Sequence, residues 1–316
     1  MQLMPTRIRP LPFAAGLTGF FFATLTTRFI STQRGPTAPS SSVGKMSSQQ
    51  TTWPVRSYTP RHKIWPYTAQ DFRRQDNSPD PSFYSSPRFV THIDDAAIAT
   101  LREYYATVLP TAPGSRILDF CSSWTSHYPE QVESAVEKGE VEVVGLGMNK
   151  RELEANKVLN GGWAVGDLNE KAELSEVLQD GVLAVGESKK FDAATNVVST
   201  DYLTKPVEVL ESLRNITKPG GRVHLVISNR CFPTKAIGRW LRVDEEERLQ
   251  MVGDFLFFAG WEDIEIVELS DGVIRDAGTS GQGGGDEGLK GFMKMMGMGS
   301  GRRDPLWVVR GTKIGE

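Results

Sequence analysis

The chain has 316 residues, 39% hydrophobic and 24% charged, so it is long enough to bury one sizeable core and to carry further segments. Its formal net charge of −3 gives no overall reason to expect nucleic-acid binding. The two cysteines, Cys121 and Cys231, are too few for a disulfide framework or a zinc cluster, so a reducing intracellular compartment is the default expectation.

The first fifty residues differ in composition from the rest of the chain. No Asp or Glu occurs before Asp71, and arginines flank an apolar run over residues 11–25. An acid-free terminus rich in Arg and Ser is typical of a mitochondrial transit peptide, so we expect residues 1–50 to be a disordered targeting segment. The apolar run is interrupted by Gly and Thr and falls short of a stable membrane span. The alternatives are a cytoplasmic protein, or one associated with a membrane through residues 11–25.

Residues 51–85 show no sustained periodicity and contain many Pro, Ser and Thr residues, which predicts a linker. The folded domain is expected over residues 86–316. It begins with a helix at 95–109, where apolar residues recur at helical spacing.

Strands and helices then alternate along the chain. Short apolar strands are predicted over residues 116–120, 141–146, 162–165, 191–198 and 222–228. Helical patterns fall between them, over residues 129–138, 150–159, 170–178 and 206–217. This alternation predicts a parallel, doubly wound α/β sheet, because parallel strands need crossover connections and are buried on both faces.

The chain ends with a predicted helix over residues 245–259 and two predicted strands over 263–269 and 306–310. Between these strands lies a segment rich in Gly and Met, residues 271–304. We expect it to be a flexible insertion.

The stretch Arg116-Ile-Leu-Asp-Phe-Cys-Ser-Ser-Trp-Thr125 has the form of a nucleotide-binding strand and turn. Its apolar run ends in Asp119, and small polar residues follow. Cys121, Ser123 and Thr125 stand where a Gly-x-Gly-x-Gly loop would carry glycine. A Cβ at these positions narrows the approach of the backbone to a ligand and penalises positive φ.

A second pattern runs from Phe191-Asp-Ala-Ala-Thr-Asn-Val-Val-Ser-Thr-Asp-Tyr-Leu203 through a helix to Leu213-Arg-Asn-Ile-Thr-Lys-Pro-Gly-Gly-Arg-Val223. With the strands before it, this pattern resembles the class I S-adenosylmethionine (SAM)-dependent methyltransferases, specifically the methyltransferase type 11-like group, with a divergent first motif. The resemblance covers about residues 110–313. It implies a seven-stranded, Rossmann-like sheet in the order 3-2-1-4-5-7-6, with the last strand antiparallel and a ligand at the carboxyl ends of the strands.

The resemblance implies that SAM is contacted by residues at the ends of the first four strands, namely Asp119, Cys121, Ser122, Ser123, Asn149, Asp167, Leu168 and Asn196. Asp119 would contact the methionine ammonium group. Asp167 would accept a hydrogen bond from the adenine amino group, and Leu168 would pack on the ring. For Asp167 the alternative role is to cap the helix that follows.

The second strand ends without the acid that the resemblance implies at the ribose hydroxyls. Asn149 stands there instead, and it either contacts the ribose or caps the next helix, because Asn149-Lys-Arg-Glu152 has the spacing of a capping box. Asp201 and Tyr202 follow the fourth strand. They are the candidates to orient or deprotonate the acceptor, with ordinary loop roles as the alternative.

The predicted activity is SAM-dependent methyl transfer to a small-molecule acceptor, with no nucleic-acid partner. Methyl transfer from a sulfonium requires alignment and exclusion of water more than a catalytic triad or a metal. The absent glycines and the absent ribose acid leave a second hypothesis open, a catalytically inactive methyltransferase-like binding or scaffold protein. A NAD-dependent oxidoreductase is disfavoured, because the chain lacks both G-x-G-x-x-G and an acid at the end of the second strand.

Overall fold

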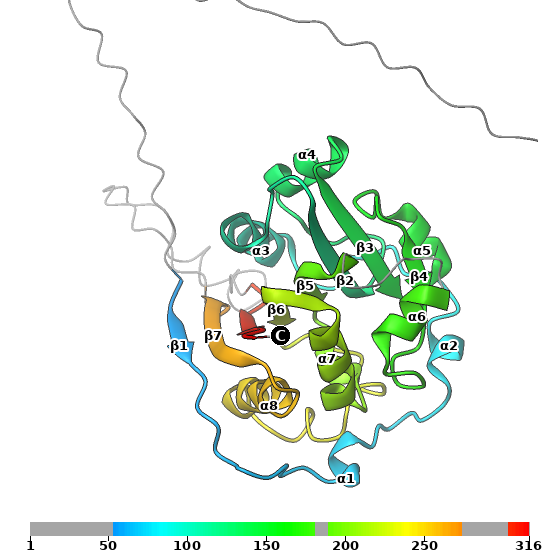
Figure 1. The fold of residues 1–316 in the computed structure, drawn as a ribbon. Helices are drawn as coiled ribbons and strands as arrows, with labels where there is room; N and C mark the ends of the chain where they lie inside the picture. The colour runs from blue at the N-terminus through cyan, green and yellow to red at the C-terminus, as the bar shows by residue number, and fades with distance from the viewer. Residues whose placement is uncertain (1–52, 181–188, 274–302, 316) are drawn as a thin grey trace, which may run out of the picture. The chain divides into compact units, whose positions relative to one another are not determined.

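The computed structural model describes residues 53–180, 189–273 and 303–315 of the chain. These residues form an eight-stranded sheet in the order β1-β7-β8-β6-β5-β2-β3-β4 (Figure 1). The strands are β1 Val55–Ser57, β2 Ser115–Ser122, β3 Val141–Gly147, β4 Trp163–Val165, β5 Phe191–Val197, β6 Thr217–Ile227, β7 Glu262–Ser270 and β8 Leu306–Thr312. The α-helices are α1 Ala69–Phe72, α2 Asp80–Phe83, α3 Asp95–Val108, α4 Glu130–Glu137, α5 Lys150–Ala155, α6 Leu174–Asp180, α7 Pro206–Asn215 and α8 Glu245–Phe258.

The five strands β6, β5, β2, β3 and β4 are parallel, and β8 lies antiparallel between β6 and β7. The predicted order of seven strands is therefore confirmed. The eighth strand, β1, was not predicted and pairs antiparallel with β7 at the edge of the sheet.

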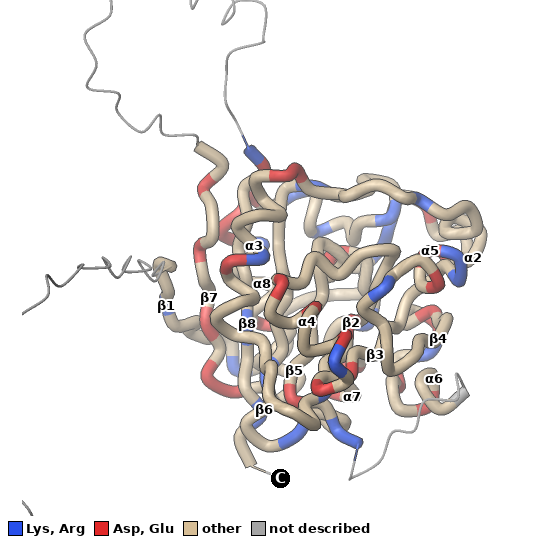
Figure 2. The backbone as a smooth tube through the Cα atoms, turned by 90° about the horizontal axis from the view of Figure 1, so that it is seen from above, with Lys and Arg blue, Asp and Glu red and all other residues tan. Residues whose placement is uncertain are grey.

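Alternate side chains of the central strands enter two buried clusters, one on each face of the sheet. In β2, Leu118 and Phe120 pack in the cluster that includes residues of α6, α7 and α8, whereas Ile117 packs in the cluster that includes residues of α3 and α4. This two-sided burial explains why the strands read as continuous apolar runs. Acidic and basic residues are interspersed along the described elements (Figure 2).

The Lys-Pro-Gly-Gly segment, residues 218–221, falls between the predicted helix 206–217 and the predicted strand 222–228, and in the structure it is a bulge inside β6. Phe191 pairs with Thr217 but Ala193 pairs with Arg222, so the four residues 218–221 of β6 lie opposite the single residue Asp192 of β5. Gly220 has a φ of 78°, which glycine adopts without strain, and its N–H donates to the Lys313 carbonyl at 2.8 Å.

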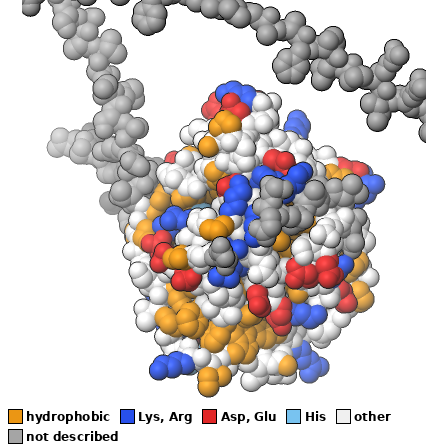
Figure 3. Space-filling view, viewed as in Figure 1, with side chains coloured by type: hydrophobic (Ala, Val, Ile, Leu, Met, Phe, Trp, Pro, Cys, Tyr) orange, Lys and Arg blue, Asp and Glu red, His pale blue; other side chains and the backbone are white. Residues whose placement is uncertain are grey.

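Residues 53–94, here called the strap, pack along the domain from β7 past α8 to α5 (Figure 1). The Tyr67 hydroxyl donates to Asp254 on α8 at 2.5 Å, and Tyr58 donates to the same carboxylate. A Cβ on Gly253 would lie 2.3 Å from the Tyr58 ring, so glycine makes room for it. The described part of the segment expected to be a linker is thus built into the domain. Hydrophobic side chains gather on the surface over α8 (Figure 3).

Two other expectations fall largely outside the described residues. The targeting segment 1–50 lies outside them entirely, and of the insertion 271–304 only residues 271–273 and 303–304 are described. Within the described ranges, no helix is long and apolar enough to cross a membrane.

Candidate functional site

A cavity of about 270 Å³ lies at the carboxyl ends of the parallel strands. One side, here called the strand wall, is built from the ends of β2, β3 and β4 and includes Asp119, Cys121, Ser122, Ser123, Thr125, Gly147, Asn149, Glu152, Gly166, Asp167 and Leu168. The other side, here called the strap wall, comes from the strap and includes Asp80, Tyr84, Arg88, His92 and Ile93. Residues after β5 and β6 close the cavity between them and include Val198, Ser199, Tyr202, Arg230, Cys231 and Phe232.

Asp119 is held by three hydroxyl groups. Its Oδ2 accepts hydrogen bonds from Ser122 and Ser126 at 2.6 Å each, and its Oδ1 accepts one from Thr195 at 3.2 Å. Burial raises the pKa of the carboxyl group, and the three hydroxyls oppose that rise. Ser126 and Thr195 were not predicted, because only the fold brings them to the end of β2. The result is a fixed carboxyl group at the edge of the cavity.

The loop after β2 adopts at Cys121 the conformation that glycine would favour. Cys121 has a φ of 54° and lies at a bulge between Phe120 and Ser122. Burial raises the pKa of its thiol to about 12, so the thiol stays protonated at neutral pH. The loop does not lie at a helix N-terminus, because α4 begins only at Glu130.

The backbone of the loop after β2 lies close to the end of the neighbouring strand β3, and a glycine in β3 makes this approach possible. A Cβ on Gly147 would lie 2.2 Å from the Ser122 carbonyl oxygen, a distance that no real Cβ tolerates. The glycine that lets the β2 loop and β3 come together therefore stands at the end of β3. This requirement was not visible in the spacing of the first motif.

Asn149 caps α5, and its amide is fully used by the protein. Its Oδ1 accepts from the N–H groups of Arg151 and Glu152 at 3.0 and 3.3 Å. Its Nδ2 donates to the carbonyls of Tyr84 and Ser85 at 2.7 and 3.3 Å. Of the two roles left open by the sequence, the structure shows the capping role.

The end of β3 carries no acid, but Glu152 stands three residues after Asn149, in the first turn of α5. Glu152 lines the cavity and is 7% exposed. Its Oε1 accepts from the Arg88 N–H at 2.7 Å, and among the described residues its second oxygen has no hydrogen-bond partner. Burial raises the pKa of this carboxyl group. The sequence marked Glu152 only as the last residue of a capping box.

Asp167 and Leu168 both line the cavity after β4. The Asp167 Oδ1 accepts from the Asn169 N–H at 2.9 Å, and α6 begins only at Leu174, so Asp167 does not cap that helix. Burial raises the pKa of the Asp167 carboxyl group. Asn169 itself donates to Asp80 at 2.8 Å and thereby joins the strand wall to the strap wall.

Two predicted site residues are not among those that line the cavity. Asn196 is fully buried, donates to the Phe120 carbonyl at 3.1 Å and accepts from Thr200 at 3.0 Å. Asp201 is 2% exposed, and burial raises the pKa of its carboxyl group far above the usual value. Tyr202 does line the cavity, and its hydroxyl oxygen accepts from the Phe232 N–H at 2.8 Å.

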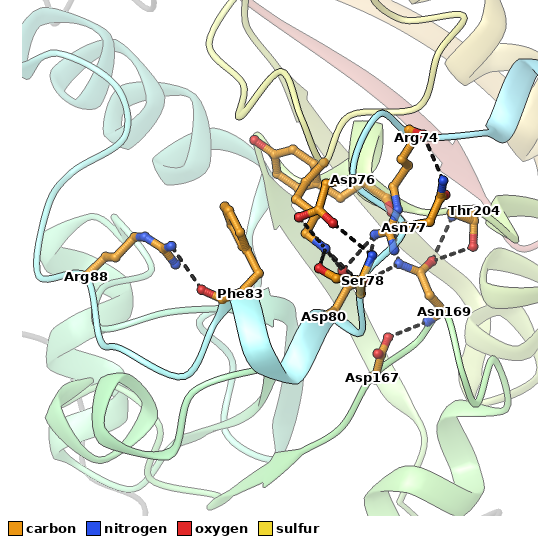
Figure 4. Close-up of polar contacts among 12 residues, drawn as sticks. Arg74, Asp76, Asn77, Ser78, Asp80, Phe83, Arg88, Asp167, Asn169 and Thr204 are labelled. Carbon is orange, nitrogen blue, oxygen red and sulfur yellow. Dashed lines mark hydrogen bonds and ion pairs between the residues drawn. The ribbon is translucent and has the colours of Figure 1, made fainter.

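The strap wall is fixed by a buried cluster of charges (Figure 4). The Arg74 Nη1 lies 2.8 Å from each oxygen of Asp80, and the Lys235 Nζ lies 3.3 Å from Asp80 and 3.2 Å from Asp76. The Lys235 side chain is fully buried and also donates to the Ser78 carbonyl at 2.7 Å. Burial opposes ionisation of Asp80, but hydrogen bonds from Arg74 and Asn169 outweigh it and lower the pKa of the carboxyl group.

Two histidines also line the cavity. Burial lowers the pKa of His127 to about 4, and burial together with the nearby Arg88 lowers the pKa of His92. Both imidazoles are therefore neutral at pH 7, and burial disfavours their protonated forms. The His92 ring meets Phe232 edge to face, with ring centroids 5.6 Å apart.

Comparisons with known proteins give structural neighbours only. No protein-family model matches the chain, and no curated protein matches it. The chain is similar to a SAM-dependent methyltransferase from Archaeoglobus fulgidus, at 13% identity over 68% of this chain and 94% of that chain, with a TM-score of 0.41. It is similar to phosphoethanolamine N-methyltransferase 2 from Haemonchus contortus in complex with S-adenosyl-L-methionine, at 13% identity over 70% of this chain and 53% of that chain, with a TM-score of 0.39. It is also similar to the [4+2]-cyclase SpnF, at 15% identity over 74% and 92% of the two chains, with a TM-score of 0.43.

Proposed function

We propose that this cavity binds SAM and that the protein transfers the methyl group to a small-molecule acceptor. One observation carries the proposal: three acidic residues stand at or beyond the C-terminal ends of three adjacent parallel strands and line the same cavity. They are Asp119 in the C-terminal half of β2, Glu152 after β3 and Asp167 after β4. Carboxyl groups in these places suit a ligand that combines an ammonium group, a ribose diol and an adenine amino group.

Each of the three acidic residues is assigned to one part of the ligand. Asp119, fixed by three hydroxyls, would hold the ammonium group. The unpartnered oxygen of Glu152 would accept from the ribose hydroxyls, in place of the acid absent at the end of β3. Asp167 would accept from the adenine amino group and Leu168 would pack on the ring.

The cavity, at about 270 Å³, lies just below the roughly 300 to 1,000 Å³ that ligand pockets span. Gly147 and Gly166 line it without a Cβ, and a Cβ on Gly166 would lie 2.2 Å from Val177.

Bound SAM would supply a methyl group already activated on a sulfonium, so the protein has to align the acceptor, exclude water and receive a proton. Of the two neutral histidines that line the cavity, His92 lies beside Phe232, and we assign it to accept that proton. The Tyr202 hydroxyl is held by the Phe232 N–H, which suits it to orient the acceptor. His92 takes the place that the sequence led us to give to Asp201.

Calorimetry with SAM and S-adenosylhomocysteine (SAH) tests the proposal. We expect micromolar binding to the wild-type protein and at least a tenfold loss for Asp119→Asn, because the substitution removes a fixed negative charge. Glu262→Gln, on the exposed end of β7, is the matched control and should bind as the wild type does. No binding at millimolar ligand would contradict the proposal and favour the alternative, an inactive methyltransferase-like scaffold.

Two finer parts of the proposal rest on the sequence alone. One is membership of the methyltransferase type 11-like group, carried by the strand and Pro-Gly-Gly pattern over residues 191–223. The other is mitochondrial import directed by residues 1–50. A fluorescent protein fused to those residues should enter mitochondria, and a diffuse cytosolic signal would contradict import.

A further inference from the structure

The strap wall contains a guanidinium group surrounded by aromatic rings. The Arg88 Cζ lies 4.4 Å from the centroid of the Phe83 ring, 5.2 Å from that of Phe232 and 5.6 Å from that of Tyr84. Its Nη2 donates to the Phe83 carbonyl at 3.0 Å (Figure 4). The rings and this bond hold the side chain in one place at the cavity.

One N–H-bearing nitrogen of the Arg88 guanidinium lacks a hydrogen-bond partner within the described residues. Arg88 Nη1 is buried and has no hydrogen-bond partner, and within the described residues no carboxylate forms an ion pair with the side chain. The Glu152 carboxylate accepts a hydrogen bond from the Arg88 backbone N–H, not from the guanidinium. A buried N–H group of a cation is costly without a partner, and an anionic oxygen is the partner that satisfies it best.

Arg88 adjoins the part of the cavity assigned to SAM, because its N–H donates to Glu152, but the rings around its guanidinium come from outside the strand wall. Its rings Phe83 and Tyr84 belong to the strap, and Phe232 follows β6, on the far side of β5 from β2, β3 and β4. Tyr202 stacks on Phe232 with ring centroids 6.0 Å apart, and His92 meets the same ring. The surroundings therefore combine one unsatisfied cationic donor, flat apolar surfaces and a neutral imidazole.

We propose that Arg88 binds a carboxylate or another oxyanion of the methyl acceptor, and that the acceptor is a small organic acid with a flat apolar body. The proposal rests on the proposed function for the identity of the reaction, but not for the anion site itself. Arg88 acts here as a specificity-determining residue: its charge selects anionic acceptors, and the rings of Phe232 and Tyr202 contact the apolar body.

Ligand-observed NMR in the presence of saturating SAH tests this, with benzoate, phenyl phosphate and neutral benzamide as probes. We expect benzoate or phenyl phosphate to bind the wild-type protein at least fivefold more tightly than benzamide. Arg88→Met should lower the affinity for the anion at least tenfold. Arg88→Lys should recover part of it, because lysine keeps the charge but loses the guanidinium geometry. Arg102→Met, which removes an arginine outside the cavity, should behave as the wild type.

SAH affinity is measured for each variant and separates the possible outcomes. If Arg88→Met binds SAH as the wild type does, the variant is folded and a loss of benzoate binding belongs to the acceptor site. If SAH affinity falls tenfold instead, Arg88 serves the carboxylate of the methionine moiety and the proposal is overturned. Equal binding of benzoate and benzamide, or no binding of either anion to the wild type, also overturns it. Anion binding that depends on Arg88 in a protein that does not bind SAH would contradict only the proposed function.

Discussion

The two walls of the cavity come from segments that differ in sequence pattern and in secondary structure. The strand wall comes from the ends of three apolar strands, and its acids lie within the end of a strand or follow it within a few residues. The strap wall comes from residues 80–93, which have little regular secondary structure beyond the one-turn helix α2 and lie far along the chain from most of what they contact. One wall is held by the sheet and the other by individual polar contacts.

This difference decides how each wall responds to substitution. In the strand wall, hydrogen bonds between strands and two buried clusters support each residue, so single side chains are replaceable unless they block backbone contact. In the strap wall, a few buried charges carry the attachment. Removing one partner there leaves the others buried without compensation.

Asp80→Ala should have the largest effect on stability. It leaves Arg74 and the fully buried Lys235 without their shared partner, and breaking a buried pair in this way costs about 3–5 kcal/mol. Urea unfolding at pH 7 measures the loss. Asp76→Ala is the matched control: Asp76 contacts the same lysine but is 36% exposed, so its removal should cost far less. Equal losses for the two variants would show that the strap is not held at Asp80.

The contribution of Asp80 should also depend on pH. Its pKa in the folded protein is lowered from the ordinary 3.8, so the stability it adds is fully present above that value. It is lost as the pH falls through the lowered pKa. The difference in unfolding free energy between the wild type and Asp80→Asn should therefore be constant from pH 5 to pH 8 and shrink below about pH 3.8. A difference that instead grows on acidification would contradict the ionised state of Asp80.

Gly147→Ala should have the next largest effect and tests the strand wall. The added Cβ meets the Ser122 carbonyl oxygen, a backbone atom that cannot rotate away, and overpacking of this kind costs about 1–3 kcal/mol. SAH affinity should fall as well, because Ser122 and the Gly147 backbone both line the cavity. Gly145→Ala is the control, since its Cβ meets the end of the Leu159 side chain, which can move. Thermal denaturation that ranks the two variants the other way would remove the special role of Gly147.

Cys121→Gly should have the smallest effect, although it restores the residue expected from the first motif. Glycine relieves the cost of a φ of 54° but adds freedom to the unfolded chain, and the two terms nearly cancel, leaving less than about 1 kcal/mol. We expect SAH affinity to change by less than threefold. A tenfold gain would show that the cysteine at this position limits cofactor binding.

The strand wall could be predicted from the sequence because its signals are local. The positions of seven strands follow from apolar runs and the residues that end them, whereas the order of these strands and the grouping of Asp119, Asp167 and Leu168 at one site were implied by the resemblance of the sequence. Glu152 was missed as a cavity residue because its role depends on where α5 begins relative to β3. Asn196 and Asp201 were placed at the site because they stand at or just after the end of a strand, but Asn196 is buried within β5 and Asp201 is buried in the 3-10 turn Thr200–Tyr202.

The strap wall could not be predicted because its contacts have no local signature. Nothing in the sequence near Asp80 indicates Lys235 as its partner, and a segment rich in Pro and Ser has the composition of a linker whether or not it is anchored. Asn169 joins Asp80 to Tyr202 and Thr204 through contacts that span 33 to 89 residues. Such contacts become visible only in three dimensions.

The strap also determines when the cavity can form during protein synthesis. Ser78 leaves the ribosome early, but the lysine that holds it lies 157 residues further along the chain. Until that later part has emerged and β6 has joined the sheet, the nascent chain has only one wall of the cavity and no place for Arg88 to face Phe232. Nascent chains arrested at increasing lengths should therefore gain the ability to bind ligand late and in one step, after most of the domain has been translated.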